Sequence, residues 1–304
     1  TLGEDIDFSA FDELGDVELY TKAQTTEENA ERIQDADIIV VNKLPVDKDL
    51  LDSAHNLKMV ALSATGTNNV NFEYTDKRNI IVKNVKGYST QSVVQHTFAM
   101  LFYLYEKLPK YDRFVKNGHY NKYHMFSCFT PYFNELAGKT WGIIGLGAIG
   151  RKVADIAKAF DCNVIYYSAS GNNNTPGYTR VSLDSLLESS DIVSLHCALT
   201  DSTTNIINSE TLHKMKSNAI LLNLGRGPLV NEADLAMALD EGIIAAAGLD
   251  VLCAEPIQSD NPLLNIKDTD KLLITPHMAW GTIEARARCV KEVYNNIKEY
   301  ITSI

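Results

Sequence analysis

The sequence is poor in the features of disulfide-rich, metal-binding and membrane-spanning proteins. Its cysteines are odd in number, scattered and without a Cys-x-x-Cys pair, so we expect neither a disulfide framework nor a metal site. They are Cys128, Cys162, Cys197, Cys253 and Cys289. Apolar runs such as residues 98–105 are less than half of the ~20 residues that cross a bilayer, and no signal-type segment is present. We therefore expect a soluble cytoplasmic protein with reduced thiols.

Positive charge is also in short supply. The chain has 28 Lys and Arg residues against 39 Asp and Glu, a net charge of −11. Such a molecule repels phosphate backbones and anionic lipids, so neither nucleic acid nor membrane is expected as a partner. The 45% apolar and 22% charged residues are typical of a globular protein, and 304 residues indicate two domains at ~150 residues each.

Two series of short β-branched runs alternate with helical patterns. The first predicts strands at 37–41, 57–62 and 80–82. The second begins at Lys139 and predicts strands at 140–144, 163–167, 191–196, 219–223, 243–250 and 272–275. Alternation of this kind is typical of parallel βαβ units, and six strands make a complete doubly wound sheet. A helix at 282–300 follows the last strand and is expected to cross back onto the first domain.

The helical pattern from Val93 to Leu108 has no polar stripe between Phe98 and Tyr105. A helix that is apolar on all sides is expected to be buried on all sides. Two interpretations stay open: an interior core helix, or a helix between domains or between subunits.

A glycine-rich hexamer, Gly145-Leu146-Gly147-Ala148-Ile149-Gly150, follows the apolar strand pattern and opens a helical one. The order of strand, glycine turn and helix is what dinucleotide binding requires. Gly145 permits the tight turn, Gly147 lets the backbone approach a pyrophosphate, and Gly150 permits close packing of helix on strand. We therefore predict a dinucleotide-binding loop.

The position that selects between NAD and NADP holds Ser168, about 20 residues past the glycines, where an acidic residue would bind the adenosine ribose. A carboxylate there repels the 2′-phosphate of NADP and a serine does not. Residues 163–178 nevertheless contain no Arg or Lys to bind that phosphate. NAD is favoured weakly and NADP stays open.

Three chemically suited residues follow predicted strands of the second series: Arg226, Glu255 and His277. Ligands bind at the carboxyl ends of the strands in open α/β sheets. Arg226 stands between two glycines and offers a bidentate fork to a carboxylate. Each of the three alone would be read as a salt bridge, a solvated loop acid or a structural histidine. Their combination favours a catalytic site.

Further segments of the sequence match one family in order. They are Ala64–Val70 (ATGTNNV), Gly87–Val93 (GYSTQSV), His196–Thr200 (HCALT), Gly248–Val251 (GLDV) and Thr275–Trp280 (TPHMAW). With the glycine hexamer and the arginine segment, they make the chain resemble the NAD-dependent D-2-hydroxyacid dehydrogenases, which include glycerate dehydrogenases and hydroxypyruvate reductases. Two departures are Ser168 for the usual Asp and Ala198 for the usual Pro. The family's opening strand has no counterpart, and the sequence starts abruptly at Thr1-Leu2-Gly3.

The resemblance implies an α/β protein of two doubly wound parallel-sheet domains. Residues 91–278 would form an inserted Rossmann dinucleotide-binding domain. Residues 1–90 and 279–304 would form a flavodoxin-like substrate domain.

The resemblance also implies roles for named residues. Arg226 would bind the substrate carboxylate and carbonyl oxygen. His277 would be the general acid in reduction and the general base in oxidation, with Glu255 favouring its protonated form. Substrate would contact Ala64, Thr65, Gly66 and Trp280. The cofactor would contact Gly145, Gly147, Ala148, Ile149, Gly150, Ser168, His196, Thr203, Leu224, Gly225 and Asp250, the last through the nicotinamide amide.

Substrate choice depends on Met278-Ala279-Trp280, which resembles members that act on hydroxypyruvate or glyoxylate. The alternative is D-lactate or another D-2-hydroxy acid with a branched carbon skeleton. A corepressor-like protein that senses NAD(H) is the alternative without catalysis, because fold does not fix function. Formate dehydrogenase is disfavoured because those enzymes have glutamine at the position of Glu255. The apolar helix and family habit predict a homodimer.

Overall fold

The computed structural model describes residues 2–20, 25–172 and 174–303. The protein forms two compact units. The smaller unit combines residues 1–89 with 280–304, and the larger unit contains residues 90–279. No helix among the described residues is both long and apolar enough to span a membrane.

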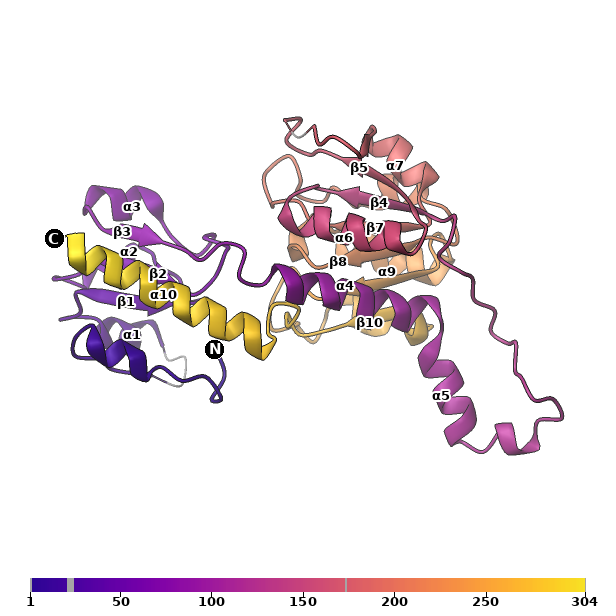
Figure 1. Ribbon diagram of the computed structural model, residues 1–304, viewed down its shortest axis with the longest axis horizontal. Coiled ribbons are helices and arrows are strands. Elements are labelled where there is room, and N and C mark those ends of the chain that lie inside the picture. Colours follow the sequence, from indigo (N-terminus) through magenta and orange to yellow (C-terminus); the bar gives the residue numbers. More distant parts are fainter. Residues whose placement is uncertain (1, 21–24, 173, 304) are drawn as a thin grey trace. The chain divides into compact units, whose positions relative to one another are not determined.

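The smaller unit is built on a parallel sheet in the order β1-β2-β3. Its elements are η1(Ser9–Glu13), α1(Thr26–Arg32), β1(Ile38–Val41), α2(Lys48–Asp52), β2(Met59–Leu62), α3(Phe72–Lys77), β3(Ile81–Lys83) and α10(Ile283–Ser303). The central strand is fully buried, because its side chains alternate between two cores. Met59 and Ala61 pack with α10, which lies along one face of the sheet (Figure 1), and Val60 and Leu62 pack with α2.

The larger unit contains a parallel sheet of seven strands in the order β10-β9-β8-β7-β4-β5-β6. They are β4(Thr140–Ile144), β5(Asn163–Tyr167), β6(Thr179–Arg180), β7(Ile192–Leu195), β8(Ile220–Asn223), β9(Ala246–Leu249) and β10(Leu272–Ile274). The strand order reverses between β4 and β7, so a ligand-binding crevice is expected at their carboxyl ends. All six strands predicted for this region are present, and β6 is an additional short edge strand.

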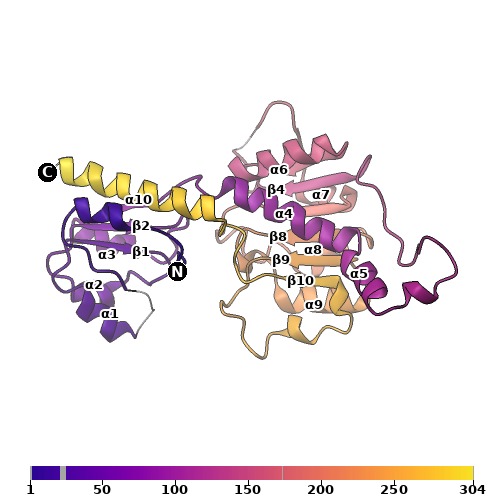
Figure 2. The ribbon, with the colours of Figure 1, turned by 60° about the horizontal axis from the view of Figure 1, so that its bottom comes forward.

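Helices cover both faces of this sheet (Figures 1 and 2). One face carries α4(Thr90–Tyr105) and α6(Ala148–Ala159), and the other carries α7(Leu183–Ser189), α8(Ser209–His213) and α9(Glu232–Glu241). The main core lies between the sheet and the second group of helices. The 3₁₀ turns η3(Gly227–Leu229), η4(Pro262–Asn265) and η5(Thr269–Lys271) lie in the connections between the last three strands.

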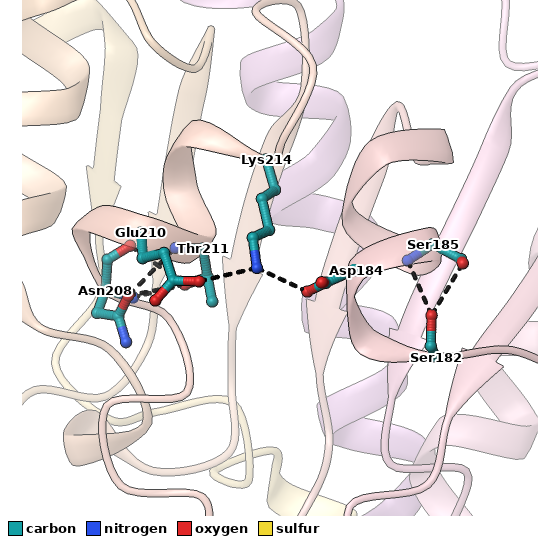
Figure 3. Close-up of polar contacts among 7 residues, drawn as sticks. All are labelled: Ser182, Asp184, Ser185, Asn208, Glu210, Thr211 and Lys214. Carbon is teal, nitrogen blue, oxygen red and sulfur yellow. Dashed lines mark hydrogen bonds and ion pairs between the residues drawn. The ribbon is translucent and has the colours of Figure 1, made fainter.

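Local polar contacts fix the starts of two short helices (Figure 3). Ser182 caps α7 by accepting the Ser185 N–H at 3.1 Å, and Asn208 caps α8. The Lys214 ammonium lies 2.9 Å from both Asp184 of α7 and Glu210 of α8. Such a surface ion network contributes little to stability, so it is a local connection between two helices and not a ligand site.

The apolar helix α4 is not buried on all sides, which corrects the expectation of all-round burial. Gln91, Gln95, Ala99 and Tyr103 form an exposed stripe at four-residue spacing. A helix lying on one face of a sheet buries only the side that faces the sheet. This excludes the interior-core interpretation and leaves the interface interpretation open.

After α4 the backbone leaves the body of the larger unit (Figures 1 and 2). The projecting segment, residues 108–135, contains α5(Leu108–Lys116), η2(Tyr120–Lys122) and an extended return, and we call it the arm. Large apolar side chains on it are exposed, among them Phe126 at 90% and Tyr132 at 82%. A monomeric protein rarely exposes such a patch, so the arm is a candidate contact surface.

Candidate active site

The glycine hexamer joins β4 to α6 as the pattern predicts. Gly145 has φ +96°, and a Cβ there would lie 2.5 Å from the Cys197 nitrogen. A Cβ on Gly150 would lie 2.3 Å from the Gly145 carbonyl oxygen. Both glycines are therefore required by the fold itself. Gly147, the N-cap of α6, has open space at its Cβ position, which leaves room for a ligand to approach the backbone.

The segments beyond the hexamer fit a dinucleotide in their polar character. The first turn of α6 leaves backbone N–H groups without helical partners, which suits a pyrophosphate. Ser168 follows β5 directly and is 4% exposed. Among the described residues no group of His, Cys, Asp and Glu side chains could hold a metal ion.

A buried polar network lies at the junction of β4 and β7. The Trp141 indole N–H donates to the Ser194 hydroxyl at 2.9 Å, and His196 Nε2 lies 3.1 Å from the same oxygen. Burial lowers the pKa of His196 to about 4, so this imidazole is neutral at physiological pH. The network fixes the end of β7 next to the glycine hexamer.

The turn after β7 is closed by Thr203, which is 2% exposed. Its hydroxyl donates to the Ala198 carbonyl and accepts the Thr200 N–H, both at 2.8 Å. Its side chain is therefore committed to the shape of this turn.

The loop after β8 presents Arg226. Asn223, fully buried at the end of β8, accepts the Gly225 N–H at 3.1 Å and donates to the Arg226 carbonyl at 2.9 Å. Arg226 Nη1 donates to the Gly225 carbonyl at 2.8 Å. The half-buried guanidinium takes part in none of the ion pairs found among the described residues, so it is available for an external anion.

The loop after β9 lies against the arginine turn. A Cβ on Gly227 would lie 2.0 Å from the Leu252 carbonyl, so only glycine permits this approach. Glu232, at the start of α9, accepts the Cys253 N–H and the Asn261 side-chain N–H, both at 2.7 Å. The loop that carries Glu255 is thus held from two sides.

Glu255 and His277 meet although 22 residues separate them. His277 Nδ1 lies 2.6 Å from Glu255 Oε2, and Glu255 Oε1 accepts the Leu252 N–H at 3.0 Å. The Glu255 and His277 side chains are 34% and 20% exposed, so the pair is reachable but partly desolvated. His277 has φ +50°, a backbone conformation that a non-glycine residue adopts only when its surroundings hold it.

Asp250, at the end of β9, has a carboxylate that is 1% exposed and accepts hydrogen bonds from nearby backbone and side-chain donors. Oδ1 accepts from Thr275 and Met278, and Oδ2 accepts from Ala279. One acceptor position remains on Oδ2. Leu224 is also buried, at 7% exposure.

The other predicted substrate residues belong to the smaller unit. The Thr65 hydroxyl donates to the Val85 carbonyl at 2.8 Å, and the Ala64 carbonyl accepts the Val85 N–H at 3.0 Å. The Trp280 ring packs edge-on against Tyr88, with 6.4 Å between ring centroids. The smaller unit therefore fixes both segments internally.

Several supporting residues were missed in the sequence. Asn223 and Thr275 stand at strand ends, and a polar residue closing an apolar strand is the signal that points to them. Glu232 and His96 gave no signal, because their partners lie on other elements.

The fold and these loops define a Rossmann-type oxidoreductase. The model of the family "D-isomer specific 2-hydroxyacid dehydrogenase, NAD binding domain" matches residues 98–279. A hydroxypyruvate reductase from Blautia hydrogenotrophica is 38% identical over 98% of this sequence and 92% of its own. A glycerate dehydrogenase from Methylorubrum extorquens is 36% identical over 93% and 88%. D-lactate dehydrogenase from Aquifex aeolicus, solved with NAD and lactic acid, has a TM-score of 0.86 at 27% identity, covering 99% and 94%.

The chain belongs to the D-isomer specific 2-hydroxyacid dehydrogenases, NAD(P)-dependent oxidoreductases. The resemblance read from the sequence motifs is confirmed, and so is the α/β fold with a Rossmann dinucleotide-binding domain.

Proposed function

We propose that the protein reduces hydroxypyruvate or glyoxylate reversibly to D-glycerate or glycolate, with NADH as the preferred reductant. The observation that carries this proposal is the 2.6 Å contact between His277 and Glu255, in a unit where Arg226 follows the neighbouring strand β8. The names of the relatives from Blautia hydrogenotrophica and Methylorubrum extorquens support the substrate class.

His277 is the proton donor. Glu255 Oε2 accepts a hydrogen bond, so the proton between the two side chains is assigned to His277 Nδ1. Nε2 then carries the proton that moves to the substrate oxygen in reduction and returns in oxidation. Glu255 stabilises the imidazolium, as an acidic partner does in other acid–base pairs.

Arg226 binds the 2-keto acid. Its planar guanidinium pairs with a carboxylate in bidentate fashion and stabilises negative charge that develops on the carbonyl oxygen. The bond from Nη1 to Gly225 fixes one edge of the group. The remaining donors are those that a substrate would engage.

The larger unit binds the dinucleotide through residues 145–150, which fit a pyrophosphate at the start of α6. When bound, the nicotinamide supplies or takes the hydride. The remaining contacts come from Ser168, His196, Thr203, Leu224, Gly225 and Asp250. NADP stays possible because Ser168 carries no charge to repel a 2′-phosphate.

The smaller unit serves as the substrate domain. The N–H groups of Thr65 and Gly66 donate none of the hydrogen bonds found among the described residues, which suits a carboxylate. Trp280 supplies an apolar wall.

The protein acts as a cytoplasmic homodimer. The arm exposes Phe126, Phe129 and Tyr132 in one stretch, at 90%, 65% and 82%. A second copy of the protein is the occupant that fits, because the exposed stripe of α4 precedes the arm directly. All five cysteines are free, as suits a reducing compartment. The charge balance speaks against nucleic acid and membrane as partners.

The test is the initial rate of NADH and NADPH oxidation with hydroxypyruvate, glyoxylate, pyruvate, phenylpyruvate and 2-oxoisocaproate. We expect the highest kcat/KM with hydroxypyruvate or glyoxylate and NADH. A higher kcat/KM with pyruvate or 2-oxoisocaproate would assign the D-lactate or branched-skeleton alternative. Binding of NADH without turnover of any acid would favour a dinucleotide sensor.

A further inference from the structure

One residue holds three consecutive backbone amides of the segment that carries His277. The Asp250 carbonyl accepts the His277 N–H at 2.8 Å. The Asp250 carboxylate accepts the N–H groups of Met278 and Ala279, each at 2.9 Å. The conformation of this segment is therefore set by a residue at the end of the neighbouring strand, β9.

Thr275 joins this arrangement from the other side of His277. Its hydroxyl donates to Asp250 Oδ1 at 2.6 Å, and its carbonyl accepts the His277 N–H at 2.9 Å. A hydroxyl has a single proton, and that of Thr275 is used on the carboxylate. Any further polar neighbour of this oxygen must therefore act as a donor.

His96 supplies that donor from α4, an element far away in the sequence. Its Nε2 lies 3.1 Å from the Thr275 hydroxyl oxygen and 3.6 Å from Asp250 Oδ1. The proton count assigns an N–H to Nε2, because the Thr275 proton points to Asp250. His96 is also the one basic side chain that pairs with Asp250 among the described residues.

The strain at His277 gives this series of contacts a purpose. Its φ of +50° is unfavourable for a residue with a Cβ and persists only where neighbouring bonds fix it. All of the bonds just described converge on His277 and the residues on either side of it. The imidazole can meet Glu255 at 2.6 Å only while this backbone conformation holds.

We propose that His96, Thr275 and Asp250 are positioning residues that hold His277 in register with Glu255. This inference rests on the proposed function, in which His277 is the proton donor. His96 and Thr275 act through the loop and need not touch the substrate.

Two pairs of variants test the proposal. Thr275→Val removes the hydroxyl at similar volume, and Thr275→Ser retains it. His96→Leu removes the donor, and His96→Gln retains one on a flexible side chain. We expect kcat for reduction to fall about tenfold or more in Thr275→Val and His96→Leu, because displaced catalytic groups lose rate steeply. KM for the keto acid and Kd for NADH should stay within about threefold, and Thr275→Ser should recover most of kcat. His55→Leu, which changes an exposed histidine in the smaller unit, is the matched control.

Two kinetic results would overturn the proposal. One is a kcat within about twofold of wild type in both Thr275→Val and His96→Leu. The other is an equal loss in Thr275→Ser and Thr275→Val. A lower melting temperature with unchanged kcat per folded active site would also overturn it, because the residues would then serve stability alone.

A measurement without turnover separates this proposal from the proposed function. The imidazole ¹⁵N chemical shifts of His277 report whether Nδ1 carries the proton bonded to Glu255. We expect them to change in Thr275→Val and to stay at wild-type values in Thr275→Ser and His55→Leu. Unchanged shifts in Thr275→Val would overturn the positioning role, whether or not the wild type reduces a keto acid. Absence of keto-acid turnover by the wild type, with shifts that respond as expected, would reject the proposed function alone.

Discussion

The strand-end loops and the arm belong to the same unit but satisfy their side chains in opposite ways. In the loops, Asn223, Asp250 and Glu255 each bond to groups of the protein itself. In the arm, Phe126 and Tyr132 stand almost fully in solvent. The loops are organised before any ligand arrives, which lowers the entropic cost of binding. The arm has its apolar surface unburied, which indicates that a second copy of the protein completes it.

The largest expected effect is on the preorganised side of this comparison. In His277→Ala, kcat for keto-acid reduction should fall about 1,000-fold, or about 4 kcal/mol, because general acid catalysis is lost. Kd for NADH should stay within about threefold, since the glycine hexamer is untouched. Stopped-flow and steady-state rates, with His213→Ala on α8 as control, measure this. A loss of less than about tenfold would remove His277 from the mechanism.

A pH experiment tests how firmly the loops are fixed beneath the glycine hexamer. The folded-state pKa of His196, about 4, lies below the ordinary value of 6.5. Between these values the unfolded state binds more protons, so stability is complete above pH 6.5 and is lost as pH falls through 4. We expect a loss of about 3 kcal/mol between about pH 7 and pH 4 from this residue.

The measurement is urea unfolding of the wild type and His196→Gln at both pH values. The variant should lose about 3 kcal/mol less than the wild type, because glutamine has no titrating group. Equal losses in the two proteins would show that His196 is not held neutral by burial.

Two glycine substitutions sharpen the same comparison by separating folding from binding. In Gly147→Ala the new methyl group meets nothing within 4 Å, so the melting temperature should not change. NADH binding should weaken about tenfold, or about 1.4 kcal/mol, because the methyl group occupies space that the pyrophosphate needs. Gly150→Ala is the matched variant that should also destabilise the fold, since its Cβ would lie 2.3 Å from a carbonyl oxygen. Unchanged NADH affinity in Gly147→Ala, measured by calorimetry, would place the dinucleotide elsewhere.

The sequence predicted most of the sheet because buried parallel strands are β-branched runs that stand out locally. It missed β6, whose two residues, Thr179 and Arg180, are exposed and have no apolar run. It also placed the end of α4 at Leu108, whereas the helix ends at Tyr105 and a new one begins at Leu108. Lys107 has φ +57°, and Pro109 in the first turn of α5 explains the new start.

The candidate site shows the same contrast. The glycine hexamer is local in sequence, so its turn could be predicted from spacing and flanking patterns alone. The contact between Glu255 and His277 depends on β9 and β10 being neighbours, which no local pattern contains. The bond between His96 and Thr275 spans 179 residues and joins a helix to a strand end. A single histidine in an apolar helix carries no information about such a partner.

The smallest effect on the folded protein is expected on the other side of the comparison. Phe126→Ser should change the unfolding free energy of the monomer by less than about 0.5 kcal/mol, because its side chain is 90% exposed and has little packing to lose. The double variant with Phe129→Ser should nevertheless sediment as a monomer at micromolar concentration, where the wild type sediments as a dimer. Phe72→Ser, which alters an exposed phenylalanine on α3, is the control and should leave the dimer intact. A double variant that remains dimeric would mean that the arm is not the contact surface, and the exposed stripe of α4 would then be the next surface to alter.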